Sequence, residues 1–139
     1  AEHPPSWLLL QAHPTLVPNA VEEVLRLRPI VPGLTRVAVE PFSLDDLSLD
    51  PGDRLLASFQ AANTDPAAFA EPEVFDVERT GAAAHVTFGW GPHFCVGAGL
   101  ARMELQEALR TLVERFDPPV VVGGDDATLL VRFTPRPIS

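Results

Sequence analysis

The sequence contains no lysine, only one cysteine and no long apolar run, and each shortage excludes a class of protein. A single cysteine, Cys95, cannot form an internal disulfide framework. Apolar runs stay well below the ~20 residues of a membrane-spanning helix and no signal peptide is visible, so we expect a cytoplasmic protein with no membrane anchor. All 10 basic residues are arginine and the formal net charge is -9, which disfavours nucleic acid because its binding depends on basic side chains that neutralise phosphate.

The remaining composition is typical of a globular domain with one core. Hydrophobic residues make up 46% and charged residues 21% of the 139 positions, so the chain can bury a core of ordinary size. We therefore interpret residues 1–139 as a single domain.

Helical signals recur along the chain. Hydrophobic periodicity and flanking prolines predict helices over residues 6–12, 20–28 and 100–116. Asn19 is predicted to cap the second of these, with Glu22 completing a capping box. A further helix is predicted to start at Asp65 and Pro66, which suit the cap and first positions.

Extended signals are shorter and fall between the helices. Residues 35–39 and 54–59 predict two strands of a small antiparallel sheet, and residues 120–122 and 128–133 predict a hairpin. Residues 70–94 are rich in proline, glycine and aromatic residues, and a loop of that length is usually functional. The predicted fold class is α+β, mostly helix with short antiparallel strands.

The most informative segment is residues 88–102, FGWGPHFCVGAGLAR, in which the cysteine follows a glycine-bearing loop. Gly89, Gly91 and Gly97 permit backbone conformations that a Cβ disfavours, and so allow a tight loop against a flat ligand. Cys95 precedes the strongest helix pattern, where unpaired N–H groups and the helix dipole favour a negative sulfur. A lone cysteine is more often a small buried apolar residue, so the surrounding pattern has to decide.

That pattern, F-G-x-G-x-H-x-C-x-G followed by Leu-Ala-Arg, resembles the cysteine-ligand loop of bacterial cytochromes P450. The resemblance implies the C-terminal portion of the P450 fold, with the K and L helices, small sheets, the meander and the cysteine-ligand loop. It implies haem b as cofactor, with Cys95 as the axial thiolate ligand of the iron. The other implied haem-binding residues of this segment are Phe88, Gly89, His93 and Gly97.

The helix predicted over residues 20–28 carries Glu23 and Arg26, which resemble the family's E-x-x-R pair. The resemblance implies that the pair ties down the meander through buried charge-assisted hydrogen bonds. Taken alone, two such residues on one helix face are usually a solvated pair that contributes about 0.3 kcal/mol. Where many relatives have an arginine before the meander's Phe75, this chain has Val74, so we expect the usual Glu-Arg-Arg network to lack its third member.

Two further resemblances concern the edges of the haem and the substrate. Arg36 and His93 resemble the family's two haem-propionate partners, which would neutralise two carboxylates. His93 lies two residues from Cys95 and is not expected to reach the iron that Cys95 holds. The implied substrate-facing residues are Val31, Pro32, Gly33, Leu34 and Thr35.

The resemblance implies a monooxygenase that activates dioxygen and hydroxylates a small organic substrate, using electrons from a ferredoxin-type partner. The family's I helix, whose acid and alcohol residues deliver protons to oxygen, has no counterpart here, so we expect no catalytic side chain in this chain and leave its status as an enzyme open. The missing half would be supplied elsewhere. The alternative is a truncated, non-oxygenating haem-binding or interaction module that forms a homodimer. A zinc site of His85, His93 and Cys95 is less favoured, because closed zinc sites usually have four ligands.

Overall fold

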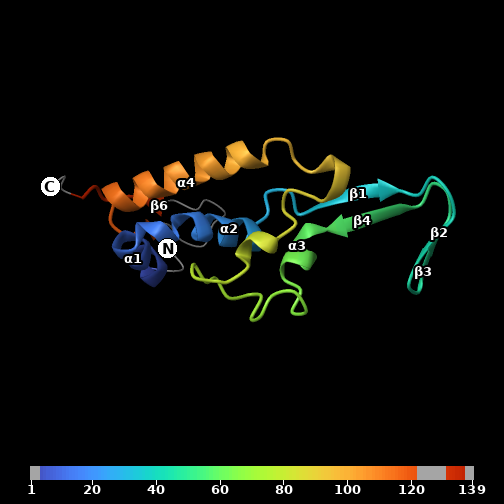
Figure 1. The fold of residues 1–139 in the computed structure, drawn as a ribbon, viewed down its shortest axis with the longest axis horizontal. Helices are drawn as coiled ribbons and strands as arrows, with labels where there is room; N and C mark the ends of the chain where they lie inside the picture. The colour runs from blue at the N-terminus through green and yellow to red at the C-terminus, as the bar shows by residue number, and fades with distance from the viewer. Residues whose placement is uncertain (1–3, 122–130, 137–139) are drawn as a thin grey trace. The chain divides into compact units, whose positions relative to one another are not determined.

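The computed structural model describes residues 4–121 and 131–136, and these residues form helices and short antiparallel strands (Figure 1). The α-helices are α1 (Pro4–Ala12), α2 (Val17–Leu27), α3 (Phe59–Asn63) and α4 (Ala98–Arg115). The strands are β1 (Gly33–Val37), β2 (Phe42–Leu44), β3 (Leu47–Leu49), β4 (Arg54–Ser58), β5 (Val120–Val121) and β6 (Val131–Arg132). Short 3-10 helices occupy Pro14–Leu16, Ala82–Ala84 and Gly91–His93. The predicted α+β class is confirmed.

The chain forms two compact units. The first comprises residues 1–23, 76–83 and 95–139, and the second comprises residues 24–75 and 84–94. Each unit joins segments that lie far apart in the sequence, so its contacts depend on tertiary structure.

In the first unit, the carboxyl end of α4 is fastened to α1 by polar side chains. Gln11 donates from Nε2 to the carbonyls of Val113 and Phe116, each at 2.9 Å, and Trp7 donates to the Phe116 carbonyl at 3.3 Å. Val113 is buried and the Phe116 ring packs edge-on against Phe133, with ring centres 5.6 Å apart. The carboxyl end of α4 is therefore held in two ways: its side chains pack, and its last carbonyls accept hydrogen bonds from α1.

The two longest predicted helices exist but begin earlier than predicted. The prediction that Asn19 caps a helix from residue 20 is wrong, because α2 begins at Val17 and contains Asn19 in its first turn. The Asn19 amide is used elsewhere, donating to the carbonyls of Val77 at 2.8 Å and Arg79 at 3.1 Å. The strongest helix pattern, predicted from residue 100, likewise starts at Ala98 with Gly97 at its cap. Among the described residues no helix combines the length and apolar character needed to cross a membrane.

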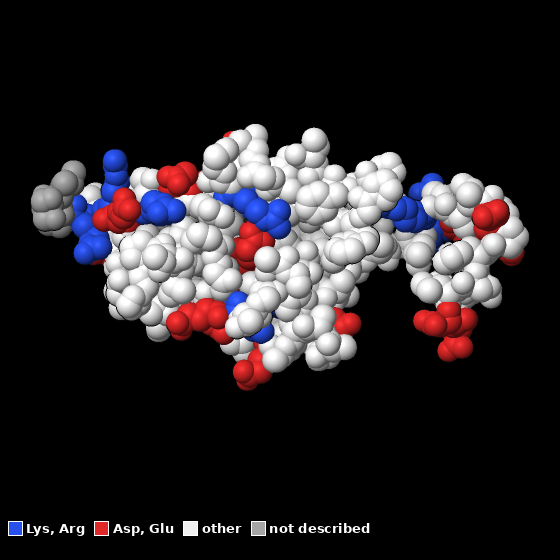
Figure 2. All heavy atoms as spheres, viewed as in Figure 1, with Lys and Arg blue, Asp and Glu red and all other residues white. Residues whose placement is uncertain are grey.

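The second unit contains the predicted antiparallel pair, β1 with β4, in a register that sets Gly33 opposite Ser58 and Val37 opposite Arg54. Gly33 is required by close approach, since a Cβ there would lie 2.6 Å from the Ala57 carbonyl oxygen. In the chain segment that connects β1 to β4, β2 and β3 form a hairpin that the sequence patterns did not predict. Its tip is the acidic pair Asp45–Asp46, where Figure 2 shows acidic side chains gathered.

The helix predicted at Asp65 and Pro66 is wrong. The chain makes only a turn there, closed by the Asp65 carboxylate, which accepts from the Ala67 N–H at 2.8 Å, a local bond that competes with helix formation. The helix lies just before it as α3, capped by Ser58, whose hydroxyl accepts from the Ala61 N–H at 3.1 Å. Five residues are too few for hydrophobic periodicity to show.

The predicted C-terminal hairpin is present as β5 paired with β6. Its predicted turn, and residues 128–130 of the second predicted strand, lie outside the described residues.

Candidate functional site

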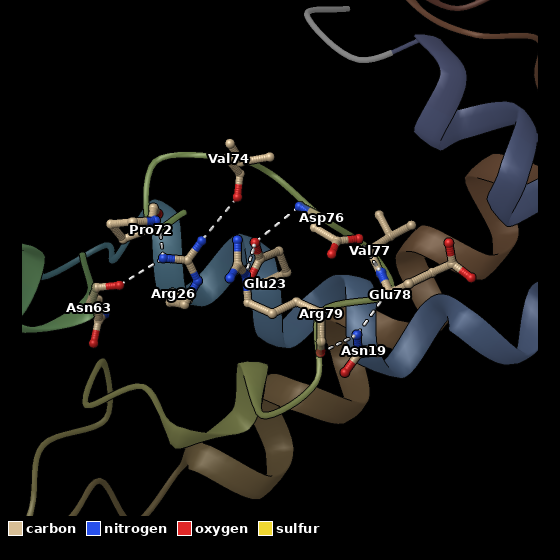
Figure 3. A network of polar contacts seen from close by, with 10 residues as sticks. All are labelled: Asn19, Glu23, Arg26, Asn63, Pro72, Val74, Asp76, Val77, Glu78 and Arg79. Carbon is tan, nitrogen blue, oxygen red and sulfur yellow. Dashed lines mark hydrogen bonds and ion pairs between the residues drawn. The ribbon is translucent and has the colours of Figure 1, made fainter. Parts of the chain in front are cut away.

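Glu23 is the anchor of the polar network in the first unit (Figure 3). Its side chain is fully buried, and its Oε1 accepts from Arg79 Nε at 2.9 Å and from the Asp76 N–H at 3.1 Å. A buried carboxylate is stable only when it is paired and hydrogen-bonded. Asn19, one turn earlier on α2, binds the carbonyls of the same loop. One face of α2 therefore holds residues 76–79, as the resemblance implied.

Arg79 also corrects an expectation. We expected Val74 to leave the Glu-Arg-Arg network without its third member, but Arg79 supplies a guanidinium five residues further along the chain. Its side chain is 9% exposed and forms an ion pair with Glu23. What Val74 contributes instead is its backbone carbonyl, which accepts a hydrogen bond from Arg26. The network thus needs a guanidinium within reach of Glu23 and not an arginine at one sequence position.

Arg26 performs the equivalent role in the second unit (Figure 3). It is fully buried, and it donates to the carbonyls of Asn63 at 2.8 Å, Pro72 at 2.7 Å and Val74 at 3.2 Å. Its guanidinium carbon also lies 5.1 Å from the centre of the Phe69 ring, within cation-π range. The planar fork of arginine can serve several acceptors at once, which a lysine ammonium does less well. Arg26 therefore gathers three separate points of residues 63–74.

Asn63 is a functional residue that the sequence did not single out. It is fully buried, with its Oδ1 accepting from the Val86 N–H at 2.8 Å and its Nδ2 donating to the Thr87 hydroxyl at 2.8 Å. The Thr87 hydroxyl in turn donates a hydrogen bond to the Leu25 carbonyl at 2.7 Å. These bonds hold the backbone immediately before Phe88, where the candidate cysteine loop begins. The sequence signal, an asparagine after a short apolar run, is shared by many ordinary caps.

The glycines of the cysteine loop have two different roles. Gly89 and Gly91 have φ angles of 78° and 75°, a left-handed backbone that favours glycine. Gly97 does not need this freedom, since its φ is -86°, and the expectation of a special backbone there is wrong. A Cβ at Gly97 would instead lie 3.8 Å from the Cys95 sulfur, in van der Waals contact. Glycine at position 97 therefore adds no side-chain atom beside the sulfur.

Cys95 is exposed, in a position where an external ligand can approach its thiol. Its carbonyl accepts the Ala98 N–H at 3.2 Å, so its backbone joins the first turn of α4. Cys95 and Gly97 belong to the first unit, whereas Phe88, Gly89 and His93 belong to the second.

The aromatic and imidazole groups before the cysteine differ in environment. Phe88 is half-buried between His85 and Phe94, with ring centres 5.9 and 6.3 Å away. His93 is exposed, whereas His85 is 8% exposed and its Nδ1 accepts the Thr87 N–H at 3.2 Å. In the part of the chain that the structure describes, no group of three or more His, Cys, Asp or Glu side chains is arranged to hold a metal ion, so the structure gives the zinc alternative no support.

Arg36 lies on β1 and is exposed, with a hydrogen bond to the neighbouring Thr35 carbonyl at 3.3 Å. It lines a cavity of about 330 Å³ whose other walls include Phe42 and Leu55. Of the predicted substrate-facing residues, Val31 and Pro32 precede β1, and Gly33, Leu34 and Thr35 form its first part. Val31 is 45% and Leu34 38% exposed, so apolar side chains of this segment are available for contact.

Comparison with known proteins identifies the family. Residues 3–131 match the family model described as Cytochrome P450. The chain is 42% identical over 124 residues to Luteothin monooxygenase of Streptomyces thioluteus, covering 88% of this chain and 30% of that protein. It is 46% identical over 114 residues to the 20-oxo-5-O-mycaminosyltylactone 23-monooxygenase of Streptomyces fradiae, covering 82% and 27% respectively.

Solved structures agree in fold. The P450 heme domain of Tepidiphilus thermophilus superposes with a TM-score of 0.84 at 35% identity, over 89% of this chain and 30% of that one. An intact type IV self-sufficient cytochrome P450 monooxygenase gives a TM-score of 0.86 at 34% identity, over 96% and 18%. The chain thus spans roughly a third or less of the length of these relatives.

Proposed function

The chain belongs to the cytochrome P450 family, and on that premise we propose that it forms the iron-holding portion of a monooxygenase that hydroxylates a small organic substrate. The observation that carries the proposal is the exposed Cys95 on the amino-terminal side of α4, with no side chain at position 97 to contact its sulfur.

The family's cofactor is haem b, and the residues present fit it. Cys95 offers an accessible sulfur ligand, while the exposed Arg36 and His93 offer donors for two propionates. Phe88 presents a half-buried aromatic surface suited to a flat ring. When bound, haem with a thiolate ligand supplies the activation of dioxygen.

This chain's own contribution is to hold and orient. Glu23 fastens residues 76–79 in the first unit, and Arg26 fastens residues 63–74 in the second. We further propose that residues 31–35 contact the substrate, and that a ferredoxin-type partner delivers electrons. Both relatives named above carry monooxygenase names, and this supports the proposed class of reaction.

The assignment of Cys95 is tested by absorption spectroscopy on the protein expressed from its own gene. Reduced protein with carbon monoxide should show the strongly red-shifted Soret band of a thiolate ligand. Cys95→Ser should abolish that band, because the chain has one cysteine, while Val96→Ser, at the fully exposed neighbour, should keep it. A band that persists in Cys95→Ser would refute the ligand assignment.

The propionate partners are tested by haem retention. Arg36→Gln should raise the rate of haem transfer to an acceptor protein, because it removes a charge-assisted bond. Arg54→Gln is the matched control, since Arg54 lies on β4 of the same sheet and is also exposed. Equal rates for the two variants would exclude Arg36 as a haem partner. Thiolate-bound haem without hydroxylation of any substrate, with ferredoxin and reductase supplied, would favour the non-oxygenating module instead.

A further inference from the structure

A further ion pair, which is partly buried, joins α2 and α4 within the first unit. Arg102 of α4 donates from Nε to Glu22 Oε1 at 2.7 Å and from a terminal nitrogen to Glu22 Oε2 at 3.0 Å. The side chains are 27% and 11% exposed. Two parallel short bonds between a guanidinium and a carboxylate define both distance and orientation. The pair therefore restricts rotation of α4 against α2 more than a single solvated contact does.

Arg102 acts on the turn that carries Cys95. The Cys95 carbonyl accepts the Ala98 N–H, and the Gly97 carbonyl accepts the Ala101 N–H at 2.9 Å. Arg102 is the next residue of the same helix, so its bond to Glu22 anchors this first turn. The opposite end of α4 is held separately, by Gln11 of α1. Loss of the Arg102 bond should therefore loosen the amino-terminal end and leave the other end in place.

Glu22 lies next to Glu23, which holds residues 76–79 through Arg79. Adjacent positions on a helix point about 100° apart, so α2 uses one carboxylate for the meander and the other for α4. From the sequence we predicted that Glu22 helps to cap its own helix, whereas Arg102, which it binds, lies 80 residues away.

We propose that Glu22 and Arg102 are positioning residues that hold the first turn of α4, and with it the Cys95 sulfur, in the orientation that ligates haem iron. The proposal rests on the proposed function for its consequence. Neither residue touches the cofactor in this scheme; both act through the backbone of residues 95–101.

The test follows the thiolate band of the reduced carbon monoxide complex, and its rate of conversion to the band of a complex without thiolate. Arg102→Gln and Glu22→Gln should each accelerate conversion about tenfold, since each removes a charge-assisted bond. The double variant should be no faster than the faster single variant, because one interaction is lost in all three. Arg110→Gln is the control, since Arg110 also lies on α4 and forms a long ion pair of 3.7 Å with Glu107 of the same helix. Conversion in Arg102→Gln as slow as in Arg110→Gln would overturn the proposal.

A measurement without haem separates this proposal from the proposed function. Hydrogen exchange of the Ala98 and Ala101 amides should be about tenfold faster in Arg102→Gln than in Arg110→Gln, with Phe116 unchanged. Arg102→Lys keeps the charge, loses the fork, and should give an intermediate rate. A wild-type protein that shows no thiolate band would refute the proposed function. Unchanged exchange at Ala98 in Arg102→Gln would refute only the positioning role of Glu22 and Arg102.

Discussion

Replacing Arg26 by methionine should be among the most damaging single changes in this chain. Arg26 is fully buried and donates hydrogen bonds to three carbonyl oxygens, at 2.7, 2.8 and 3.2 Å. Methionine has similar length and would fill much of the space, so the loss is chiefly polar. The Asn63 carbonyl belongs to a buried residue and should remain unsatisfied, at about 1–3 kcal/mol. Val74 is 50% exposed, so water can replace much of that bond.

With the cation-π contact to Phe69 included, the expected loss of unfolding free energy is about 3–5 kcal/mol. Urea unfolding followed by circular dichroism measures it. Arg28→Met is the matched control, because Arg28 directly follows α2 and its side chain is exposed, with a long hydrogen bond of 3.4 Å to the Leu27 carbonyl. That control should change stability by less than about 0.5 kcal/mol. A difference below about 1 kcal/mol between the two variants would refute the assigned role of Arg26.

Two further predictions concern packing and charge. Gly33→Ala should lower the thermal midpoint, because the new Cβ would lie 2.6 Å from a carbonyl oxygen of β4. Gly99→Ala, which places a Cβ in open space on α4, should raise the free energy of unfolding by about 0.5–1 kcal/mol. Differential scanning calorimetry measures both, and a shift of the thermal midpoint in the same direction for the two variants would contradict this reasoning. Arg79→Met should cost about 3 kcal/mol by removing this ion pair from the buried Glu23 charge, and Glu23→Gln in that background should recover part of the loss. Additive effects of these two changes in urea unfolding would show that they do not act as a pair.

The local sequence patterns predicted which helices are present better than they predicted where each helix begins and ends. The pattern of residues 100–116 located α4 within two residues at its start, because apolar residues on one face of a long helix recur visibly. Its predicted buried face is only partly buried: Val113 is 1% exposed but Leu105 is 37% exposed. Periodicity identifies which residues share a face, but what covers that face depends on other segments.

Asn19 and Glu22 show why capping predictions failed. Both residue types, at that spacing, satisfy free N–H groups at a helix start, and the sequence offers no local reason to choose another partner. In the folded chain Asn19 bonds carbonyls 58 and 60 residues away, and Glu22 bonds a guanidinium 80 residues away. The 3-10 helix at residues 14–16 leads directly into α2, so the start of α2 lies before Asn19. The side chains of Asn19 and Glu22 are therefore available to bind these distant groups.

The sequence by itself determined the α+β class, the identity of Cys95 as the candidate ligand, and the pairing of Glu23 and Arg26 with the meander. Each of these is carried by contiguous motifs, whose residue spacing is independent of the rest of the chain. Only the tertiary structure decided that Arg79 completes the network in place of Val74, that Asn63 supports the segment before Phe88, and that Arg102 meets Glu22. Burial makes an unpaired charge or amide costly, so each buried polar group needs a partner. That partner can lie at any distance along the sequence, and only the folded chain shows which residue it is.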